Sequence, residues 1–196
     1  KFYGEGSWTS QVVADSYKYA VDNGAKIITI SYNIDGFVND NLYKESIKFV
    51  RDNGVLLFNS AGNGSRQDPP RRVFEEVVLV CSTRSDGKKP TQADVMSKFS
   101  NYGKGIDICA PGDPILAPVN GQYQGQSRYG ELSGTSMAAP TAAAVAALIW
   151  SKYPELTHME VLAKLYATAD DISAQNSRRT GQLGAGRVNA FRAVSE

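Results

Sequence analysis

A serine and an asparagine stand at positions where backbone geometry can prepare them for chemistry. Ser136 lies in Gly134–Pro140 (GTSMAAP), directly before an alanine-rich stretch that predicts a helix. At a helix start the backbone N–H groups lack intrahelical partners and the dipole favours negative charge, which suits a nucleophile whose attack creates an oxyanion. Asn63, between two glycines in Ser60–Gly64 (SAGNG), can direct its amide at the same point. Taken alone, such a serine is more often a helix cap and such an asparagine a turn residue.

Two helix–strand pairs of the same design are expected to position these residues. Val12–Asp22 and Leu42–Asp52 carry apolar residues at helical spacing, and each is followed by Asn-Gly, where the glycine supplies the left-handed residue that ends a helix. The apolar runs Lys26–Tyr32 and Val55–Phe58 follow and predict strands buried on both faces. This order predicts a parallel sheet with right-handed crossovers. Sites in such sheets form beyond the carboxyl ends of the strands, which is where Asn63 lies.

The middle of the chain predicts two further strands and long connections. Val77–Cys81 and Ile106–Cys109 are apolar enough to be strands. Ser85–Gly105 is polar and Pro111–Gln126 is rich in Pro, Gly and Gln, so both are expected to be mostly loop, the second with room for short strands. No linker or long-period repeat divides the chain, so we expect one domain.

Two helices are expected in the last third of the chain. Thr135–Lys152 is apolar on nearly all sides, which indicates a buried helix, and the Tyr-Pro pair after it ends the helix. Thr157 and Glu160 have the spacing of a capping box for a surface helix at roughly Met159–Thr168.

Composition and charge exclude several classes of function. The chain has 196 residues and a formal net charge of +1, which gives no sign of nucleic acid or an anionic membrane as a partner. No apolar run is long enough to span a bilayer. Neither Cys81 nor Cys109 belongs to a cluster that would bind zinc. We interpret them as two buried free thiols, with a disulfide between neighbouring strands as the alternative.

Seven short segments match, in order along the whole chain, a pattern of one enzyme family. They are Gly4–Ser7, Lys26–Asn33, Asn59–Gly64, Phe99–Gly103 (FSNYG), Ala110–Gly112 (APG), Gly134–Pro140 and Gly184–Ala190 (GAGRVNA). On these segments the chain resembles the subtilase family of subtilisin-like serine proteases (peptidase S8). The resemblance implies an α/β, subtilisin-like three-layer fold with a parallel sheet, present here as a partial catalytic domain over residues 1–196 with the N-terminal part missing. It also implies a secreted or exported enzyme.

The resemblance further implies roles for individual residues. Ser136 would be the nucleophile, and the Asn63 amide with the Ser136 N–H would hold the oxyanion. The polypeptide substrate would be gripped as an added strand. The residues implied in substrate binding are Gly6, Ser7, Trp8, Ser31, Tyr32, Asn33, Ser60, Ala61 and Gly62. No cofactor follows from the sequence; a structural calcium ion fits the family, but no set of ligands for it is identifiable.

The catalytic triad is where the sequence departs from the family. Subtilases carry Asp and His on an N-terminal portion, and nothing here resembles the histidine motif. The single histidine, His158, follows the long helix. Sixteen residues at about 1.5 Å each put Lys152 roughly 24 Å from Ser136, so His158 is expected too far away to act as the base. A serine without a base is a poor nucleophile, so we expect the chain to be inactive without an N-terminal portion or partner chain that carries Asp and His.

Two smaller departures concern the substrate groove. Asn33 stands where subtilases often have glycine, and its side chain is expected to narrow the groove. The loop after Asn63 is short and contains Arg66, Arg71 and Arg72. This region shapes the first specificity pocket in the family, so its preference is open and an acidic residue is among the candidates.

The sequence leaves two other functions to weigh, and it also predicts that the chain associates with itself. The chain can be a non-catalytic subtilase-like module that binds a peptide or protein. An α/β-hydrolase is disfavoured because the serine lacks the GxSxG elbow. Without a neighbouring portion, the edge of Lys26–Tyr32 and apolar helix faces would be exposed, so we also expect self-association or strand exchange.

Overall fold

The computed structural model describes residues 9–84, 94–119 and 128–195. Their helices are α1 (Ser10–Asp22), α2 (Asn41–Asp52), α3 (Thr135–Lys152), α4 (His158–Ala167) and α5 (Ala190–Ser195). The strands are β1 (Ile27–Ile30), β2 (Leu56–Ser60), β3 (Val77–Arg84), β4 (Val95–Met96), β5 (Ile108–Asp113), β6 (Ile115–Pro118) and β7 (Tyr129–Leu132). The predicted helices and main strands are therefore present, with ends that move by a few residues.

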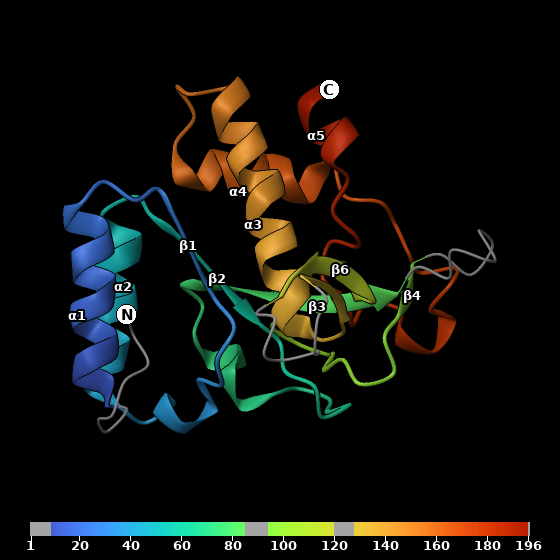
Figure 1. Cartoon of the computed structure of the whole chain (residues 1–196), viewed down its shortest axis with the longest axis horizontal. Helices are drawn as coiled ribbons and strands as arrows, with labels where there is room; N and C mark the ends of the chain where they lie inside the picture. Colours follow the sequence, from blue (N-terminus) through green and yellow to red (C-terminus); the bar gives the residue numbers. More distant parts are fainter. Residues whose placement is uncertain (1–8, 85–93, 120–127, 196) are drawn as a thin grey trace.

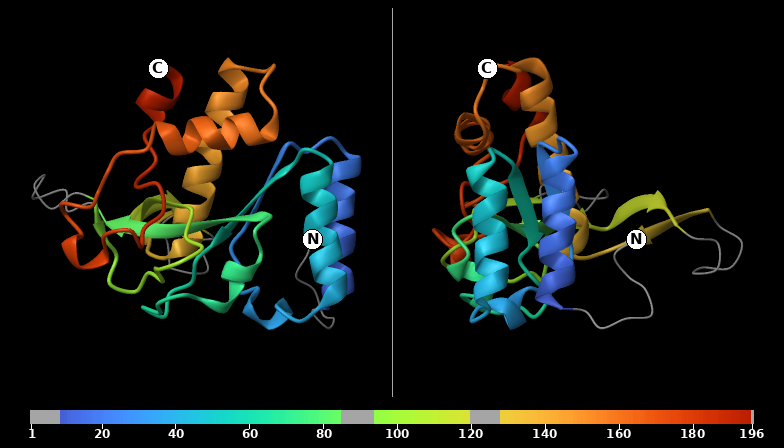
Figure 2. Two further views of the ribbon diagram at one scale, coloured as in Figure 1. Left: turned by 180° about the vertical axis from the view of Figure 1, so that it is seen from behind. Right: turned by 90° about the vertical axis from the view of Figure 1, so that its left-hand side faces the viewer.

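The main sheet is parallel through its central strands. β1 pairs with β2, β2 with β3, and β3 with β5, all in parallel, while β4 joins β3 antiparallel. β6 and β7 form a separate antiparallel hairpin that reaches out from the body in the right-hand view of Figure 2. The polar stretch Ser85–Gly105 thus contains β4, which the sequence did not indicate. The stretch Pro111–Gln126 contains β6, for which the sequence left room.

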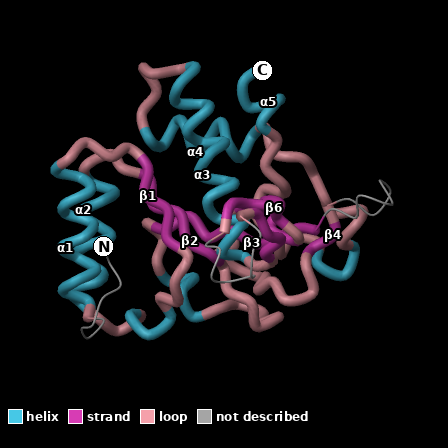
Figure 3. The backbone as a smooth tube through the Cα atoms, in the orientation of Figure 1, coloured by secondary structure: helices cyan, strands magenta, loops and turns pink. Residues whose placement is uncertain are grey.

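Helices cover the sheet on both sides, which confirms the expected three layers (Figures 1 and 3). On one face, Val13 of α1 and Ile47 of α2 pack against Leu57 and Leu79 of the sheet. On the other face the neighbouring strand residues, such as Phe58, pack against the alanines of α3 and against α4. This alternation along β2 and β3 explains why the strands are apolar throughout: each buries both of its faces.

Small side chains bring α3 close to the sheet. Ala138, Ala139, Ala142 and Ala146 are fully buried there, and α3 contacts β1, β2, β3 and β5. α4 begins with the expected capping box, in which Thr157 and Glu160 each bond the backbone N–H of the other. No helix in the described part of the chain has the length and apolar character needed to cross a membrane.

The two cysteines correct one expectation. Cys81 of β3 and Cys109 of β5 are directly opposite each other in the parallel register and form a disulfide. The interpretation as free thiols was therefore wrong. Its physical reason is the register, which brings the two α carbons to 4.4 Å and was not visible in the sequence.

Candidate active site

The start of α3 lies against the segment that follows β2. The Asn63 side-chain oxygen accepts hydrogen bonds from the backbone N–H of Thr135 at 2.9 Å and from its hydroxyl at 2.8 Å. These bonds join Asn63 to the residue directly before Ser136. The structure thus brings together the two residues to which the sequence assigned chemistry, at the carboxyl edge of the sheet.

Two N–H donors border the same small space beside Gly134. A β carbon placed on Gly134 would lie 3.4 Å from the Asn63 Nδ2 and 3.6 Å from the Ser136 backbone nitrogen. Glycine therefore keeps open the space that both donors face. Since Asn63 uses its oxygen to bond Thr135, its NH₂ group is the part turned to this space. Two such donors beside a serine hydroxyl can stabilise a developing oxyanion.

The Ser136 hydroxyl is oriented by the segment that follows β1. It donates to the carbonyl oxygen of Ser31 at 3.3 Å, and the Ser31 hydroxyl donates to the carbonyl oxygen of Ser136 at 2.9 Å. Ser136 is partly buried and Ser31 is exposed. The nucleophile candidate is therefore linked to the segment after β1 by two hydrogen bonds.

Two other residues predicted to line the cleft, Tyr32 and Asn33, form hydrogen bonds within the protein. The Tyr32 hydroxyl lies 2.5 Å from the Tyr17 hydroxyl, in a buried tyrosine cluster, and the Tyr32 carbonyl accepts from the Asn59 amide. Burial raises the pKa of Tyr17 far above its usual value, so this hydroxyl stays protonated. The Asn33 side-chain oxygen accepts from Arg71 and from the backbone N–H of Asp35. The Tyr32 hydroxyl and the Asn33 side-chain oxygen thus both have partners within the protein.

The segment Ser60–Gly62 continues from β2 to Asn63. Ala61 is fully buried and its N–H bonds the carbonyl of Val80, which extends the sheet by one residue. The Gly62 N–H donates to the Thr135 hydroxyl at 3.1 Å. Gly62 has a φ of +101°, and a β carbon there would lie 2.5 Å from the Asn101 amide nitrogen. Only glycine satisfies both conditions, so this position is fixed by backbone geometry.

Three side chains that shape this region were not assigned a role from the sequence. Asn101 ties the segment together, because its oxygen accepts from the N–H groups of Gly64 and Arg66 and its nitrogen donates to Ala61. Arg71 is only 3% exposed and forms an ion pair with Asp35. Partial burial acts to raise the pKa of Asp35, but the hydrogen bonds and charge of Arg71 outweigh it and hold that pKa below its usual range. Asn101 belongs to the FSNYG segment, but no pattern indicates the partners of Arg71.

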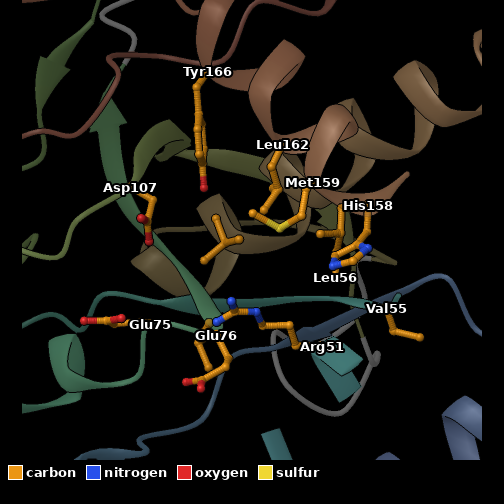
Figure 4. A pocket seen from close by; sticks show the side chains of 12 residues that line it. Arg51, Val55, Leu56, Glu75, Glu76, Asp107, His158, Met159, Leu162 and Tyr166 are labelled. Carbon is orange, nitrogen blue, oxygen red and sulfur yellow. The ribbon is translucent and has the colours of Figure 1, made fainter. Parts of the chain in front are cut away.

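His158 lies at the opposite edge of the sheet. Its Nδ1 would be 3.7 Å from a β carbon on Gly54, which precedes β2, whereas Asn63 follows β2. Figure 4 shows His158 beside Leu56 in a cavity of about 250 Å³, with Asp107 among the other lining residues. His158 therefore lies beside the start of β2, whereas Ser136 follows the residue that Asn63 bonds at the other end of β2.

Some sequence predictions fall outside the described residues. Gly6, Ser7 and Trp8, assigned to one wall of the cleft, belong to residues 1–8, about which the structure says nothing. Within the residues that are described, no group of three or more His, Cys, Asp or Glu side chains is arranged to hold a metal ion.

Comparison with known proteins shows what the chain as a whole is similar to. The Subtilase family profile (peptidase S8) matches residues 1–186. Thermitase from Thermoactinomyces vulgaris is 35% identical over 193 residues, which are 97% of this chain and 61% of thermitase. The halolysin-like extracellular serine protease Nep from Natrialba magadii is 34% identical, with 93% of this chain and 31% of that protein covered. The chain therefore spans less than two thirds of either relative.

The fold is also similar to that of solved structures. The epidermin leader peptide processing serine protease from Staphylococcus aureus superposes with a TM-score of 0.78, and the match covers 99% of this chain and 55% of that one. At 21% identity this likeness concerns the fold alone. It agrees with the three layers described above.

Proposed function

We propose that this chain, which belongs to the subtilase family, is the serine-bearing part of a serine endopeptidase that hydrolyses peptide bonds through an acyl-enzyme on Ser136. The observation that carries the proposal is the bond between the Asn63 oxygen and Thr135. It directs the Asn63 NH₂ group and the Ser136 N–H to the same space, beside the serine hydroxyl. Donors in this arrangement are what acyl transfer requires.

The chemistry follows from these positions. The Ser136 oxygen attacks the peptide carbonyl carbon while its proton passes to a histidine base. The carbonyl oxygen becomes negative and accepts from Asn63 and from the Ser136 N–H. When the tetrahedral intermediate collapses, the C–N bond breaks and the histidine gives the proton to the leaving amine. Water then attacks the ester on Ser136 by the same route and releases the acid.

The base must come from outside these 196 residues. The sequence holds one histidine, His158, and it lies at the opposite edge of the sheet from Ser136. The proposal therefore includes an N-terminal protease portion, or a separate chain, that carries the histidine and its orienting aspartate. The chain without that partner is expected to be inactive.

The substrate is proposed to bind in an extended form along the segment after β1. On one side Ser31 bonds Ser136, and on the other Gly62 bonds the preceding residue, Thr135. The backbone groups of this segment are proposed to bond the substrate as an added strand.

We propose that the protein is exported from the cell. The relative from Natrialba magadii is described as extracellular. The Cys81–Cys109 disulfide adds support, because disulfides persist mainly in oxidising compartments.

Reconstitution tests the proposal. The isolated chain should not cleave an unfolded protein, whereas the chain combined with its N-terminal portion should. Ser136→Ala should abolish cleavage, and His158→Ala is the matched control that should retain it. Cleavage that survives Ser136→Ala would rule out this chemistry. Peptide binding without any cleavage by the reconstituted protein would instead support the non-catalytic binding module.

A further inference from the structure

Arg71 is a charged side chain buried directly behind the candidate cleft. It belongs to the short 3-10 helix Pro70–Val73 and is 3% exposed. A buried charge is costly unless it is paired and hydrogen-bonded, so its partners show what holds it there. These partners come from both segments that flank Ser136, and they connect the end of β1 to the end of β2.

Every N–H of the Arg71 guanidinium has an acceptor. The Nε group donates to Asp35 at 2.9 Å. One terminal nitrogen donates to the Asn59 side chain at 3.1 Å and to the carbonyl of Ser60 at 2.7 Å. The other donates to Asn33 at 2.5 Å and to Asp35 at 3.1 Å. Since a guanidinium has five N–H donors, none remains to bind a substrate carboxylate.

The charge of Arg71 is also compensated. Asp35 accepts from two nitrogens of the guanidinium, which is the geometry of a strong bidentate pair. Asp35 is the partner that is closer to solvent, with its side chain 26% exposed against 4% for Arg71. The pair therefore presents no free positive charge to the cleft, and this argues against an acidic preference despite the basic residues of the loop.

The guanidinium spans the gap between the two segments that are proposed to bind the substrate. The residue whose carbonyl is attacked has its α carbon one bond from that carbonyl, so with the substrate bound as proposed its side chain would point between these two segments. Arg71 bridges Asn33 on the first side and Ser60 on the second. A β carbon on Gly62 would lie 3.6 Å from the Arg71 terminal nitrogen and closer still to Asn101. The near-complete burial of Arg71 means that water does not reach it from the cleft.

We infer that the Arg71–Asp35 pair closes the first specificity pocket and restricts the residue before the cut bond to a small uncharged side chain such as Gly, Ala or Ser. The inference rests on the proposed function, because it names the substrate class of the same site. It makes Arg71 a specificity-determining residue that acts by filling the space between Asn33 and Ser60, both of which it bonds.

Peptides that differ in one residue test the inference. The reconstituted protease is given matched peptides with Ala, Phe, Asp or Lys before the cut bond, and kcat/KM is measured for each. The Ala peptide should exceed the Phe, Asp and Lys peptides by about tenfold or more, since even one ill-fitting methylene group costs about 10- to 200-fold. A preference for Phe, Asp or Lys would overturn the inference.

A pair of substitutions tests whether Arg71 is the cause. Removing Arg71 alone leaves a partly buried carboxylate without its partner and endangers the fold, so Asp35→Ala is combined with Arg71→Ala. The double variant should raise kcat/KM for the Phe peptide relative to the Ala peptide by about tenfold. Arg72→Ala is the matched control, because Arg72 is exposed and bonds only the nearby backbone oxygens of Asp68 and Pro69. An unchanged Phe-to-Ala ratio in a folded double variant would also overturn the inference.

A binding experiment can distinguish the failure of this inference from the failure of the proposed function. Peptides that end at the residue before the cut bond are titrated into the Ser136→Ala protein by calorimetry, which needs no chemistry. The Ala-ended peptide should bind about tenfold or more tightly than the Phe-ended one, and the double variant should remove the difference. If no peptide is cleaved but this order holds, the proposed function fails and the closed pocket stands. Tighter binding of the Phe-ended peptide would overturn the closed pocket.

Discussion

Ser31 and Ser136 hydrogen-bond each other in both directions across 105 residues of sequence. The cause lies one turn further along α3, at Pro140. Proline has no N–H, so the carbonyl of Ser136 loses the helical bond that residue 140 would normally donate. The Ser31 hydroxyl donates to this carbonyl instead. The hydrogen bond missing within α3 is thus replaced by one from Ser31, which links the first turn of α3 to the end of β1.

Ser31→Ala should reduce kcat with little change in KM. The substitution leaves the Ser136 carbonyl without its donor and loosens the turn that carries the nucleophile. Because Ser31 is exposed, water replaces part of the bond, so we expect a loss of about 1 kcal/mol, or roughly fivefold in rate. Steady-state kinetics of the reconstituted protease measure it.

Pro140→Ala supplies the control for this prediction. It restores an N–H four residues after Ser136, so the double variant Ser31→Ala, Pro140→Ala should recover much of the lost rate. Two losses that simply add would show that Ser31 does not act through the Ser136 carbonyl.

Asn63→Asp should distinguish the effect of the Asn63 oxygen from the effect of its NH₂ group. The aspartate keeps an oxygen to accept from Thr135 but replaces the NH₂ donor with negative charge. The fold should survive while kcat falls by about 10²–10³ or more, the loss known for removing this type of donor in subtilisin-like enzymes. Asn63→Ala should show the same loss of rate together with a lower melting temperature, because it also leaves Thr135 without its acceptor. Kinetics and circular dichroism melting measure the two effects, and full activity of Asn63→Asp would exclude the oxyanion role.

Local sequence rules predicted much of this fold. The extent of the apolar run Thr135–Lys152 and the proline that follows it predicted where α3 begins and ends. The spacing of Thr157 and Glu160 located the start of α4 within one residue. Both depend on contacts inside a few turns of chain, which a single sequence contains.

Such local rules do not predict how distant strands align or which distant residues become partners. The pairing of Cys81 with Cys109 depends on how β3 and β5 align, and the burial of Arg71 depends on partners 11 to 38 residues away. In the sequence Arg71 was visible only as part of a basic loop, which left the preferred substrate residue open. The structure adds what the loop alone did not show, namely that Asp35 forms an ion pair with Arg71.

The stability of the protein should fall as pH rises from about 4 to about 6, through Asp107. Burial raises the pKa of this carboxyl from 3.8 to about 6, although the N–H of Leu79 bonds it and acts in the opposite direction. The folded state therefore binds a proton that the unfolded state has already released, and its contribution is complete below pH 3.8 and lost as pH rises through about 6. The slope is at most about 1.4 kcal/mol per pH unit for one proton.

Urea unfolding at several pH values measures this effect. Asp107→Asn is the control, since it keeps an oxygen for Leu79 but does not titrate. The other charged groups that line the same cavity are Arg51, Glu75, Glu76 and His158, and they are unchanged in this variant. If the difference in stability between the two proteins is flat from pH 4 to 6, Asp107 is not the group responsible.

The edge of β1 leads to the last prediction, which concerns association. Among the described strands β1 pairs with β2 alone, and beside it Ile27, Ala147 and Trp150 line an apolar groove of about 370 Å³. An unpaired strand edge next to apolar surface favours pairing with another chain. We expect the 196-residue chain alone to self-associate, and an N-terminal protease portion to replace that contact with a one-to-one complex. Sedimentation over a range of concentrations measures both.

Thr29→Lys provides the matched variant for this experiment. Thr29 is the exposed position of β1, and a charge there should oppose pairing at the edge, so association should begin at a higher concentration. Equal association of the variant and the parent would locate the contact elsewhere. A monomer with a sharp, concentration-independent melting transition would show that these residues need no partner to fold, and it would favour the non-catalytic binding module over the incomplete protease.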